Sequence, residues 1–347
     1  MRVDLFDYEL PGELIAQEAR PRGRSRLLVL DRSTGFVAHR AFADLPEMLG
    51  PGDLLVRNDV RVRRARLYGR DPEGRLVELL LLSALGPERV RWAALARPGR
   101  RAKKGRSIRF PEGLSALVAD VRDDGRREVV FDRAIDDSLL ERIGNVPLPP
   151  YIRREPGRPD RPEDREAYQT VFARDPIAVA APTAGLHFTP EILSRIAERG
   201  CRIADLTLAV GAGTFKPVTA KDTKEHTLDP EEVFLPEPTW ALIREARVTS
   251  RRVVAVGTTV VRALEAADRL QGIPASGTLR FATDLFITPG FEFRVVNTLL
   301  TNLHLPRSTL LMLVCAFAGR ENVLAAYGEA IREGYLFYSY GDAMLVR

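Results

Sequence analysis

The stretch that decides the fold is Arg252–Leu270, RVVAVGTTVVRALEAADRL. Its first part, up to Val256, is an apolar run rich in β-branched valines, and it is followed by Gly257-Thr258-Thr259. Beyond this turn, apolar residues recur three and four positions apart as far as Leu270, which predicts a helix after a buried strand. A strand, a short turn and a helix form the repeating unit of α/β proteins, so we expect an α/β fold.

Two further apolar runs end in a turn of small residues. Arg202–Val210 is predicted to be a strand that leads into Gly211-Ala212-Gly213-Thr214-Phe215, and Ile177–Ala181 leads into Pro182-Thr183-Ala184-Gly185. Ligands of open α/β sheets bind beyond the carboxyl ends of the strands, and glycine lets the backbone approach a ligand. The three turns are therefore predicted to converge on one site. Glycine turns after strands are also common without a ligand, and no dinucleotide or Walker A motif is present, so neither NAD nor ATP is indicated.

Other segments extend this α/β pattern on both sides. Arg26–Asp31 and Phe36–Phe42 flank a turn and predict a hairpin, and Asp53–Val56 predicts another strand. A short helix is expected at Pro11–Ala19, and a second begins at Thr189 and Pro190, which suit the N-cap and the first helical turn, and ends near Gly200. The apolar stretch Thr309–Gly319 is predicted to be a buried core element, and a helix with one apolar face follows, formed by Val323, Leu324, Tyr327, Ala330 and Ile331.

Between Val62 and Asp132 the pattern changes to short β-type runs separated by turns. The runs are Leu76–Ala84, Val90–Leu95, Leu117–Val121 and Glu128–Phe131, and their spacing predicts a small barrel or sandwich. We therefore expect an inserted, barrel-like β-domain over residues 61–149 and a discontinuous α/β domain made of residues 1–60 and 150–347. Residues 145–166, rich in proline, arginine and acids, are predicted to form a linker or loop.

The composition is that of an ordinary globular protein, with 45% hydrophobic and 29% charged residues among 347. Cys201 and Cys315 lack any CxxC context, so we expect both to be reduced core residues. No apolar signal core begins the chain and no apolar run reaches the ~18 residues of a membrane span, which predicts a cytoplasmic protein without membrane attachment. No coiled-coil pattern is present, so a monomer is expected.

A net charge of +5 and three basic clusters favour a polyanionic partner. The clusters are Arg20–Arg26, Arg61–Arg66 and Arg97–Arg106, and the third is expected on a loop of the β-domain. Solvated surface charge, or the arginine bias of a GC-rich genome, would explain the same pattern without a partner. Aromatic residues are sparse among these cations, which argues against a base-stacking sheet.

Histidines are the candidates for acid–base chemistry, and the chain has four. His187 follows the Pro182–Gly185 turn and His304 precedes the apolar core stretch, so either could be a general base or a hydrogen-bonded core imidazole. His39 lies in a strand pattern and is predicted to be structural. His226, Asp229 and Glu231 are metal-ligand types, but their spacing matches no recognised zinc motif, and a polar lining for an organic substrate is the favoured interpretation.

The two most specific strings are AAPTAGLHFT at 180–189 and TNLHLPRSTLLMLV at 301–314. Others follow in order along nearly the whole chain: LFDYELPGELIAQ at 5–17, VPLPPYIR at 146–153, VGAGTFKPV at 210–218 and YSYGDAML at 338–345. Together they resemble the S-adenosylmethionine:tRNA ribosyltransferase-isomerases of queuosine biosynthesis. The resemblance implies an α/β domain with a β-barrel insertion. It implies transfer and isomerisation of the ribosyl moiety of S-adenosylmethionine onto 7-aminomethyl-7-deazaguanine at the tRNA wobble position, with epoxyqueuosine, adenine and methionine as products.

The resemblance also implies a site, with S-adenosylmethionine consumed as a co-substrate and no metal or other cofactor. We expect His187, His304 and Asp229 in catalysis. Substrate binding is expected from Thr183, Gly185, Gly211, Gly213, Thr214, Phe215, His226, Glu231, Gly257, Thr258, Thr259, Arg262 and Asn302. Arg262 could pair with Glu265 or with substrate, and basic surface would hold the anticodon arm.

The chain departs from the family pattern where Ala209 and Asp229 replace two histidines. A divergent tRNA-binding paralogue with lost or altered catalysis is therefore the alternative, and a metal-dependent hydrolase that uses the His226 cluster is a third.

Overall fold

The computed structural model describes residues 1–211, 218–270 and 276–347, which form two compact units. The first unit comprises residues 1–60, 169–175 and 181–347, and the second comprises residues 61–168 and 176–180. The expected α/β fold with an inserted barrel is confirmed. The domain boundary expected at residue 149 stays a prediction, because compactness alone does not define a folding domain.

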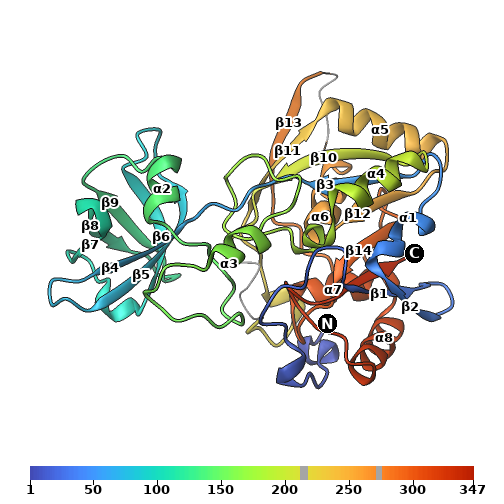
Figure 1. The fold of residues 1–347 in the computed structure, drawn as a ribbon, viewed down its shortest axis with the longest axis horizontal. Helices are drawn as coiled ribbons and strands as arrows, with labels where there is room; N and C mark the ends of the chain where they lie inside the picture. Colours follow the sequence, from blue (N-terminus) through green and yellow to red (C-terminus); the bar gives the residue numbers. More distant parts are fainter. Residues whose placement is uncertain (212–217, 271–275) are drawn as a thin grey trace. The chain divides into compact units, whose positions relative to one another are not determined.

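The described part of the first unit contains a nine-stranded mixed sheet (Figure 1). The strand order is β13 (Thr278–Thr283), β11 (Glu231–Pro236), β10 (Arg202–Leu208), β3 (Leu54–Asn58), β12 (Val253–Val256), β14 (Thr298–Asn302), β15 (Ala343–Val346), β1 (Arg26–Leu30) and β2 (Val37–Ala41). The four strands β10, β3, β12 and β14 run parallel, whereas β15 pairs antiparallel with β14 and parallel with β1. All residues of β3, β12, β14 and β15 are buried, as expected for central strands covered on both faces.

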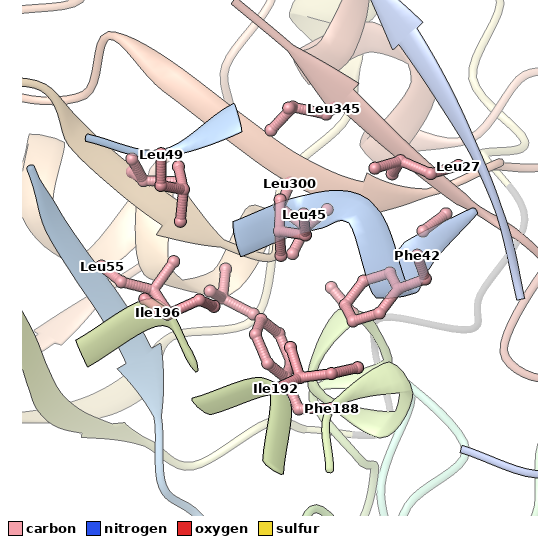
Figure 2. Close-up of a cluster of buried hydrophobic side chains, with 14 of the residues drawn as sticks. Leu27, Phe42, Leu45, Leu49, Leu55, Phe188, Ile192, Ile196, Leu300 and Leu345 are labelled. Atoms are coloured by element: carbon pink, nitrogen blue, oxygen red, sulfur yellow. The ribbon is translucent and has the colours of Figure 1, made fainter. Parts of the chain in front are cut away.

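One face of this sheet packs on short N-terminal and central helices. Phe42, Leu45 and Leu49, from the segment that contains α1 (Leu45–Met48), meet Phe188 and the buried side of α4 (Pro190–Glu198) in a single cluster (Figure 2). The strands contribute every second residue to it: Leu27, Leu55, Val254, Val256, Leu300 and Leu345. Burying a large apolar side chain is worth about 1.5–3 kcal/mol, so this cluster contributes strongly to stability.

The remaining helices of the first unit are α5 (Glu237–Val248), α6 (Thr258–Ala267), α7 (Thr309–Ala318) and α8 (Arg320–Arg332). Helix α6 follows β12 through Gly257, whose φ of 91° favours glycine, as the opening stretch of the sequence predicts. No single helix among the described residues is long and apolar enough to cross a membrane; only α7 and α8, bent by 115° at their junction, pass that test as a pair.

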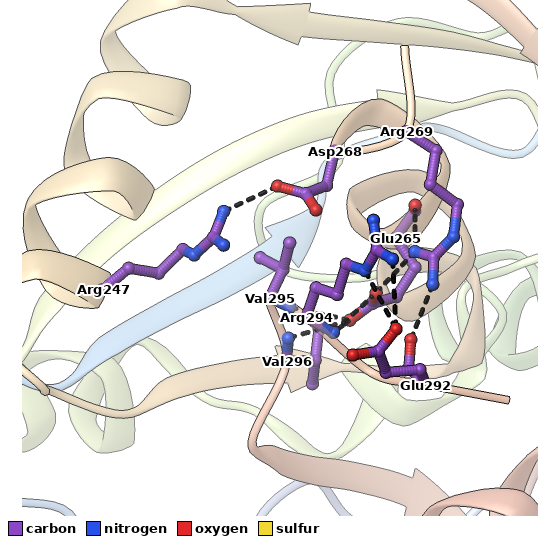
Figure 3. Close-up of polar contacts among 8 residues, drawn as sticks. All are labelled: Arg247, Glu265, Asp268, Arg269, Glu292, Arg294, Val295 and Val296. Atoms are coloured by element: carbon purple, nitrogen blue, oxygen red, sulfur yellow. Dashed lines mark hydrogen bonds and ion pairs between the residues drawn. The ribbon is translucent and has the colours of Figure 1, made fainter.

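A buried carboxylate on α6 organises the chain before β14. Glu265 is fully buried, and its oxygens accept hydrogen bonds from the backbone N–H groups of Arg294, Val295 and Val296 and from Arg269 (Figure 3). The neighbouring Asp268 pairs with Arg247 of α5 at 2.6 Å. Pairing of Glu265 with Arg262, expected from their spacing, is wrong because backbone donors and Arg269 occupy the Glu265 carboxylate.

The second unit is a closed six-stranded barrel in the order β4-β5-β6-β9-β8-β7. The strands are β4 (Arg66–Arg70), β5 (Leu76–Ala84), β6 (Arg91–Arg97), β7 (Ser107–Arg109), β8 (Ser115–Val121) and β9 (Arg127–Phe131). Alternate residues such as Val77, Leu79 and Leu81 fill its interior. Helices α2 (Asp137–Ile143) and α3 (Pro162–Ala167) follow in the chain, so the segment predicted as a linker contains one short helix.

Two local predictions are wrong. The helix expected at Pro11–Ala19 is a single 3-10 turn, Gly12–Leu14, because Ile15 instead forms a bridge with Phe337. The apolar run Ile177–Ala181 is not a strand of the main sheet, since Ala178 forms an isolated bridge with Val62 in the barrel unit.

Candidate functional site

Polar residues gather at the edge of the sheet where the parallel strands end. Strand β3 ends in Asn58 and is followed by Asp59, β12 is followed by Gly257, and β14 ends in Asn302. Since β1 and β15 run in the opposite direction to β14, they begin at this same edge, preceded by Ser25 and Asp342 respectively. This edge is where open α/β sheets place their ligand sites.

Two of the three predicted turns lie side by side there. A β-carbon added at Gly257 would be 3.6 Å from the Ala184 Cβ, which belongs to the 3-10 turn Thr183–His187. Gly257 N also donates to the carbonyl of Leu300 at 2.7 Å. Of the third turn, Gly211 is described, and its N–H donates to Glu231 at 2.8 Å. Gly213, Thr214 and Phe215 lie outside the described residues.

Neighbouring side chains leave no room for a β-carbon at Gly185. A β-carbon there would be only 2.8 Å from Phe172 Cζ and 2.8 Å from Thr170 Cγ2, so the chain itself fills the space next to this glycine. The predicted role of Gly185 in approaching a ligand stays a prediction, whereas its need for a small residue follows from these contacts.

His187 is held at both ring nitrogens. Its Nδ1 lies 2.8 Å from Ser25 Oγ, and its Nε2 lies 3.1 Å from Asn302 Nδ2. Burial, together with the nearby Arg22 guanidinium, lowers the pKa of His187 to about 4, so the ring is neutral at neutral pH. The buried ring also stacks in tilted fashion on Phe42 at 5.1 Å. A histidine so engaged is well ordered, but it must break a hydrogen bond before it can accept a proton.

His304 is also buried and follows β14. Its Nε2 is 2.8 Å from Thr301 Oγ1, its backbone N–H donates to the Tyr327 hydroxyl at 3.0 Å, and its carbonyl accepts from Tyr8. Burial lowers the pKa of His304 to about 3. These contacts are those of a core imidazole, and the predicted catalytic role of His304 stays a prediction.

The His226, Asp229 and Glu231 group is split by the structure. Glu231 begins β11 and pairs with Arg262 of α6, both side chains being buried. Arg262 also donates to the carbonyls of Leu285 at 2.9 Å and Thr283 at 3.4 Å. Within the described residues no group of three or more potential ligands could hold a metal ion. Because it pairs with Arg262, the Glu231 carboxylate is committed to an ion pair.

His226 differs from the other three histidines. Its Nε2 is buried and has no hydrogen-bond partner among the described residues, and its ring meets Phe286 edge-on at 5.3 Å. Partial burial lowers its pKa, which keeps the ring neutral and able to accept a proton. Asp229 is half-buried in the loop that leads into β11. In β2, the Nδ1 atom of His39 lies 2.9 Å from the Tyr335 hydroxyl, in keeping with a structural role.

Two buried oxygens at the sheet edge also lack partners. Thr259 Oγ1, in the first turn of α6, and Asn302 Oδ1, at the end of β14, are buried and accept or donate no hydrogen bond within the described residues. Buried polar groups in folded proteins are almost always paired, so such atoms indicate a place for a ligand or water. Thr183 is half-buried and Thr258 buried beside them.

Asp59 was missed by the sequence reasoning. It follows β3, accepts from the Thr207 hydroxyl at 2.6 Å, and burial raises its pKa. Asp59 stands directly after an apolar strand pattern, in Arg57-Asn58-Asp59, and this position in the sequence indicates a residue at the ligand-binding edge of the sheet. Ser25 was also missed, and no local pattern links it to His187, which lies 162 positions away.

The three basic clusters differ in how far internal partners occupy them. In the first, Arg20 pairs with Asp342 and Arg22 donates to the carbonyls of Leu186 and Gln169. In the second, Arg61 and Arg64 pair with Glu141, and Arg66 pairs with Glu78. In the third, on the barrel, the exposed Arg97, Arg100 and Lys103 have no acidic partner in the described part of the chain. These three cations are available to an anion, whereas Lys104 and Arg106 of the same cluster pair with Asp120 and Glu73.

The fold and the site define a class: an α/β protein with an inserted β-barrel and a largely uncharged polar site at the carboxyl ends of parallel strands. The chain belongs to the queuosine biosynthesis protein family, whose model matches residues 3–346. Proteins named S-adenosylmethionine:tRNA ribosyltransferase-isomerase are similar over its whole length. That of Moorella thermoacetica is 49% identical with both chains fully covered, and that of an Anaeromyxobacter species is 51% identical over 100% of this chain and 99% of its own.

A solved structure agrees with the fold. The crystal structure of S-adenosylmethionine tRNA ribosyltransferase from Thermotoga maritima is similar with a TM-score of 0.55 and 40% identity, over 99% of this chain and 100% of that one.

Proposed function

We propose that this chain transfers and isomerises the ribosyl moiety of S-adenosylmethionine onto 7-aminomethyl-7-deazaguanine at the wobble position of tRNA. The products are epoxyqueuosine in the tRNA, free adenine and methionine. The observation that carries the proposal is the similarity, at about half of all positions and over the full length, to proteins named for this activity. S-adenosylmethionine is a consumed co-substrate, and the reaction needs neither a metal nor another cofactor.

The chemistry requires a base that takes a proton beside the sulfonium, a proton or hydrogen bond for the departing adenine, and a preorganised polar site. The sheet edge offers polar groups of this kind in Thr258, Thr259, Asn302 and His187, with His226 and Asp229 as groups that can take up a proton. Arg262 and Glu231 neutralise each other, which supports a role in holding this edge together, and their contact with substrate stays a prediction.

The tRNA partner is proposed to contact the barrel unit through Arg97, Arg100 and Lys103. These exposed cations carry no internal counter-charge in the described residues, so phosphates can neutralise them. Because the partner is tRNA, the protein is proposed to act in the cytoplasm, as a monomer and without membrane attachment.

The test is to incubate the pure protein with S-adenosylmethionine and tRNA carrying 7-aminomethyl-7-deazaguanine in a buffer that contains a chelator. Adenine and methionine release is measured, and the tRNA is digested for mass spectrometry of the wobble nucleoside. Adenine release with epoxyqueuosine in the digest supports the proposal and its metal independence. Salt-sensitive tRNA binding without adenine release would favour the paralogue that has lost the reaction. Activity that the chelator abolishes and zinc restores would favour the metal-dependent alternative.

A further inference from the structure

The orientation of the Asn302 side-chain amide is fixed by a backbone carbonyl. Asn302 Nδ2 lies 3.1 Å from the carbonyl oxygen of Tyr338, which can only accept a hydrogen bond. The amide nitrogen, and not the oxygen, must therefore face Tyr338. Asn302 is only 2% exposed, so solvent does not compete for this contact.

This orientation determines the tautomer of His187. The second hydrogen of Asn302 Nδ2 points to His187 Nε2 at 3.1 Å, so this ring nitrogen accepts. The ring proton then resides on Nδ1 and is donated to Ser25 Oγ at 2.8 Å. The lowered pKa of His187 agrees with a neutral ring. Ser25, His187 and Asn302 thus form a chain of hydrogen bonds with one possible direction.

The chain leaves one atom without a partner, Asn302 Oδ1, which is buried. The first turn of α6, which follows β12 after Gly257, leaves another, Thr259 Oγ1, also buried. A β-carbon added at Gly257 would lie 3.7 Å from Thr259 Oγ1, and Gly257 N donates to the carbonyl of Leu300, two residues before Asn302. Burying polar atoms without partners costs stability, so these two oxygens are expected to serve a ligand.

The chemistry of the two atoms selects the ligand group. Asn302 Oδ1 can only accept, whereas the Thr259 hydroxyl can donate and accept. Of the carboxylates at this edge of the sheet, Glu231 pairs with Arg262, Asp342 pairs with Arg20, and Asp59 accepts from the Thr207 hydroxyl and lies 3.7 Å from Arg174. The two oxygens without partners are themselves uncharged. An ammonium group would need an unpaired carboxylate in a buried setting. Two neutral hydroxyls on adjacent carbons, as in a ribosyl diol, match both atoms.

We infer that Asn302 Oδ1 and Thr259 Oγ1 bind the two ribosyl hydroxyls of S-adenosylmethionine, and that Ser25 and His187 are positioning residues that aim the Asn302 carboxamide. The inference rests on the proposed function and names the part of the co-substrate that this edge of the sheet recognises.

The probe is S-adenosylhomocysteine, which is not consumed, together with its 2′-deoxy and 3′-deoxy forms. Each is titrated by calorimetry into the full chain with saturating substrate tRNA present. The unmodified protein should bind each deoxy form about five- to tenfold more weakly, the effect of one hydrogen bond. Thr259→Val should bind S-adenosylhomocysteine about as weakly and should lose its sensitivity to one of the two deoxy changes while it keeps sensitivity to the other.

Asn302→Ala should lose sensitivity to the other ribosyl hydroxyl. Ser25→Ala should reduce the sensitivity to that same ribosyl hydroxyl, whereas Ser25→Thr, which keeps the side-chain hydroxyl at position 25, should retain this sensitivity. Should Asn302→Ala fail to fold, Thr259→Val and the two Ser25 variants carry the test, because their substitutions remove or retain a single hydroxyl.

The inference is overturned if every variant stays as sensitive to both hydroxyls as the unmodified protein. Adenine release from S-adenosylmethionine is measured on the same samples. Release without discrimination of the hydroxyls defeats only this inference, and absence of both binding and release defeats the proposed function with it.

Discussion

Glu231, the first residue of β11, and Arg262, on α6, form an ion pair in the interior of the protein, with side chains 6% and 8% exposed. The second oxygen of Glu231 accepts the Gly211 N–H at 2.8 Å, so the same carboxylate also fixes the start of the predicted glycine turn. A pair that links two elements beside the candidate site is expected to contribute both to stability and to the order of that site.

Glu231→Gln should destabilise the protein by about 3–5 kcal/mol, because it leaves the Arg262 guanidinium buried without a counter-charge. The measurement is chemical denaturation followed by the fluorescence of Trp240 in α5, in a Trp92→Phe background that removes the other tryptophan, which lies in the barrel. The matched control is Glu231→Gln combined with Arg262→Met, which should cost less than Glu231→Gln alone. A double variant as unstable as the sum of the two single variants would show that the pair is not coupled.

The sequence alone predicts most of the frame, because the decisive signals are local. The valines of β12 followed by Gly257, the hairpin of β1 and β2, and the cap formed by Thr189, whose hydroxyl accepts the Ile192 N–H at 3.2 Å, each appear within about ten residues. Strand β4 was missed because its sequence, RLYGR, is half polar and contains a glycine, and its strand form depends on pairing with β5.

The site was less predictable because its contacts join distant residues. Arg262 and Glu265 are three positions apart and suggest a pair, but Arg262 binds Glu231, 31 positions away, and Glu265 binds backbone N–H groups 29 to 31 positions away. The Ser25 contact with His187 has no local signature either. Sequence identifies which residue types can do the chemistry, whereas the strand order determines which of them meet.

Binding of tRNA should depend on the basic cluster of the barrel. Removing two cations with Arg100→Ala and Lys103→Ala should weaken tRNA binding and reduce the slope of log K against log salt by about 1 to 2. The matched control removes two exposed cations from helices of the other unit, Arg244→Ala and Arg332→Ala, and so changes net charge equally. Equal weakening by both double variants would show that total charge, and not the barrel surface, governs the affinity.

Acid should destabilise the first unit well before its carboxylates titrate. Burial lowers the pKa of His187 from 6.5 to about 4 and that of His304 from 6.5 to about 3. Below pH 6.5 the unfolded chain therefore binds protons that the folded protein does not, so stability present above pH 6.5 is lost as the pH falls towards 4. Each histidine should account for a loss of about 2 kcal/mol between pH 7 and pH 5.

The same Trp240 denaturation series at pH 7, 6 and 5 measures this loss. His187→Gln should remove about 2 kcal/mol of it, because glutamine fills a similar space without titrating. His39→Gln is the matched substitution, which removes a half-exposed imidazole of β2 in the same unit. A His187→Gln variant with the full pH dependence would mean that the pKa of His187 is the same in the folded and the unfolded protein.

The base of the reaction is the remaining assignment, and the hydrogen bonds favour His226 over His187. Both nitrogens of His187 are occupied, whereas His226 has a buried Nε2 with no partner among the described residues and a neutral ring. His226→Ala should therefore lower kcat by about 10²–10⁴, the usual contribution of a general base. His187→Gln should raise KM for S-adenosylmethionine and lower kcat by less than about tenfold, because it disturbs the Asn302 carboxamide but removes no base.

Initial rates of adenine release between pH 6 and pH 9 provide both constants, with His39→Gln as the matched control. A His187→Gln enzyme that has lost its activity at every pH, beside an active His226→Ala enzyme, would return the role of base to His187. If instead only Asp229→Ala is inactive, the carboxylate beside β11 takes the proton.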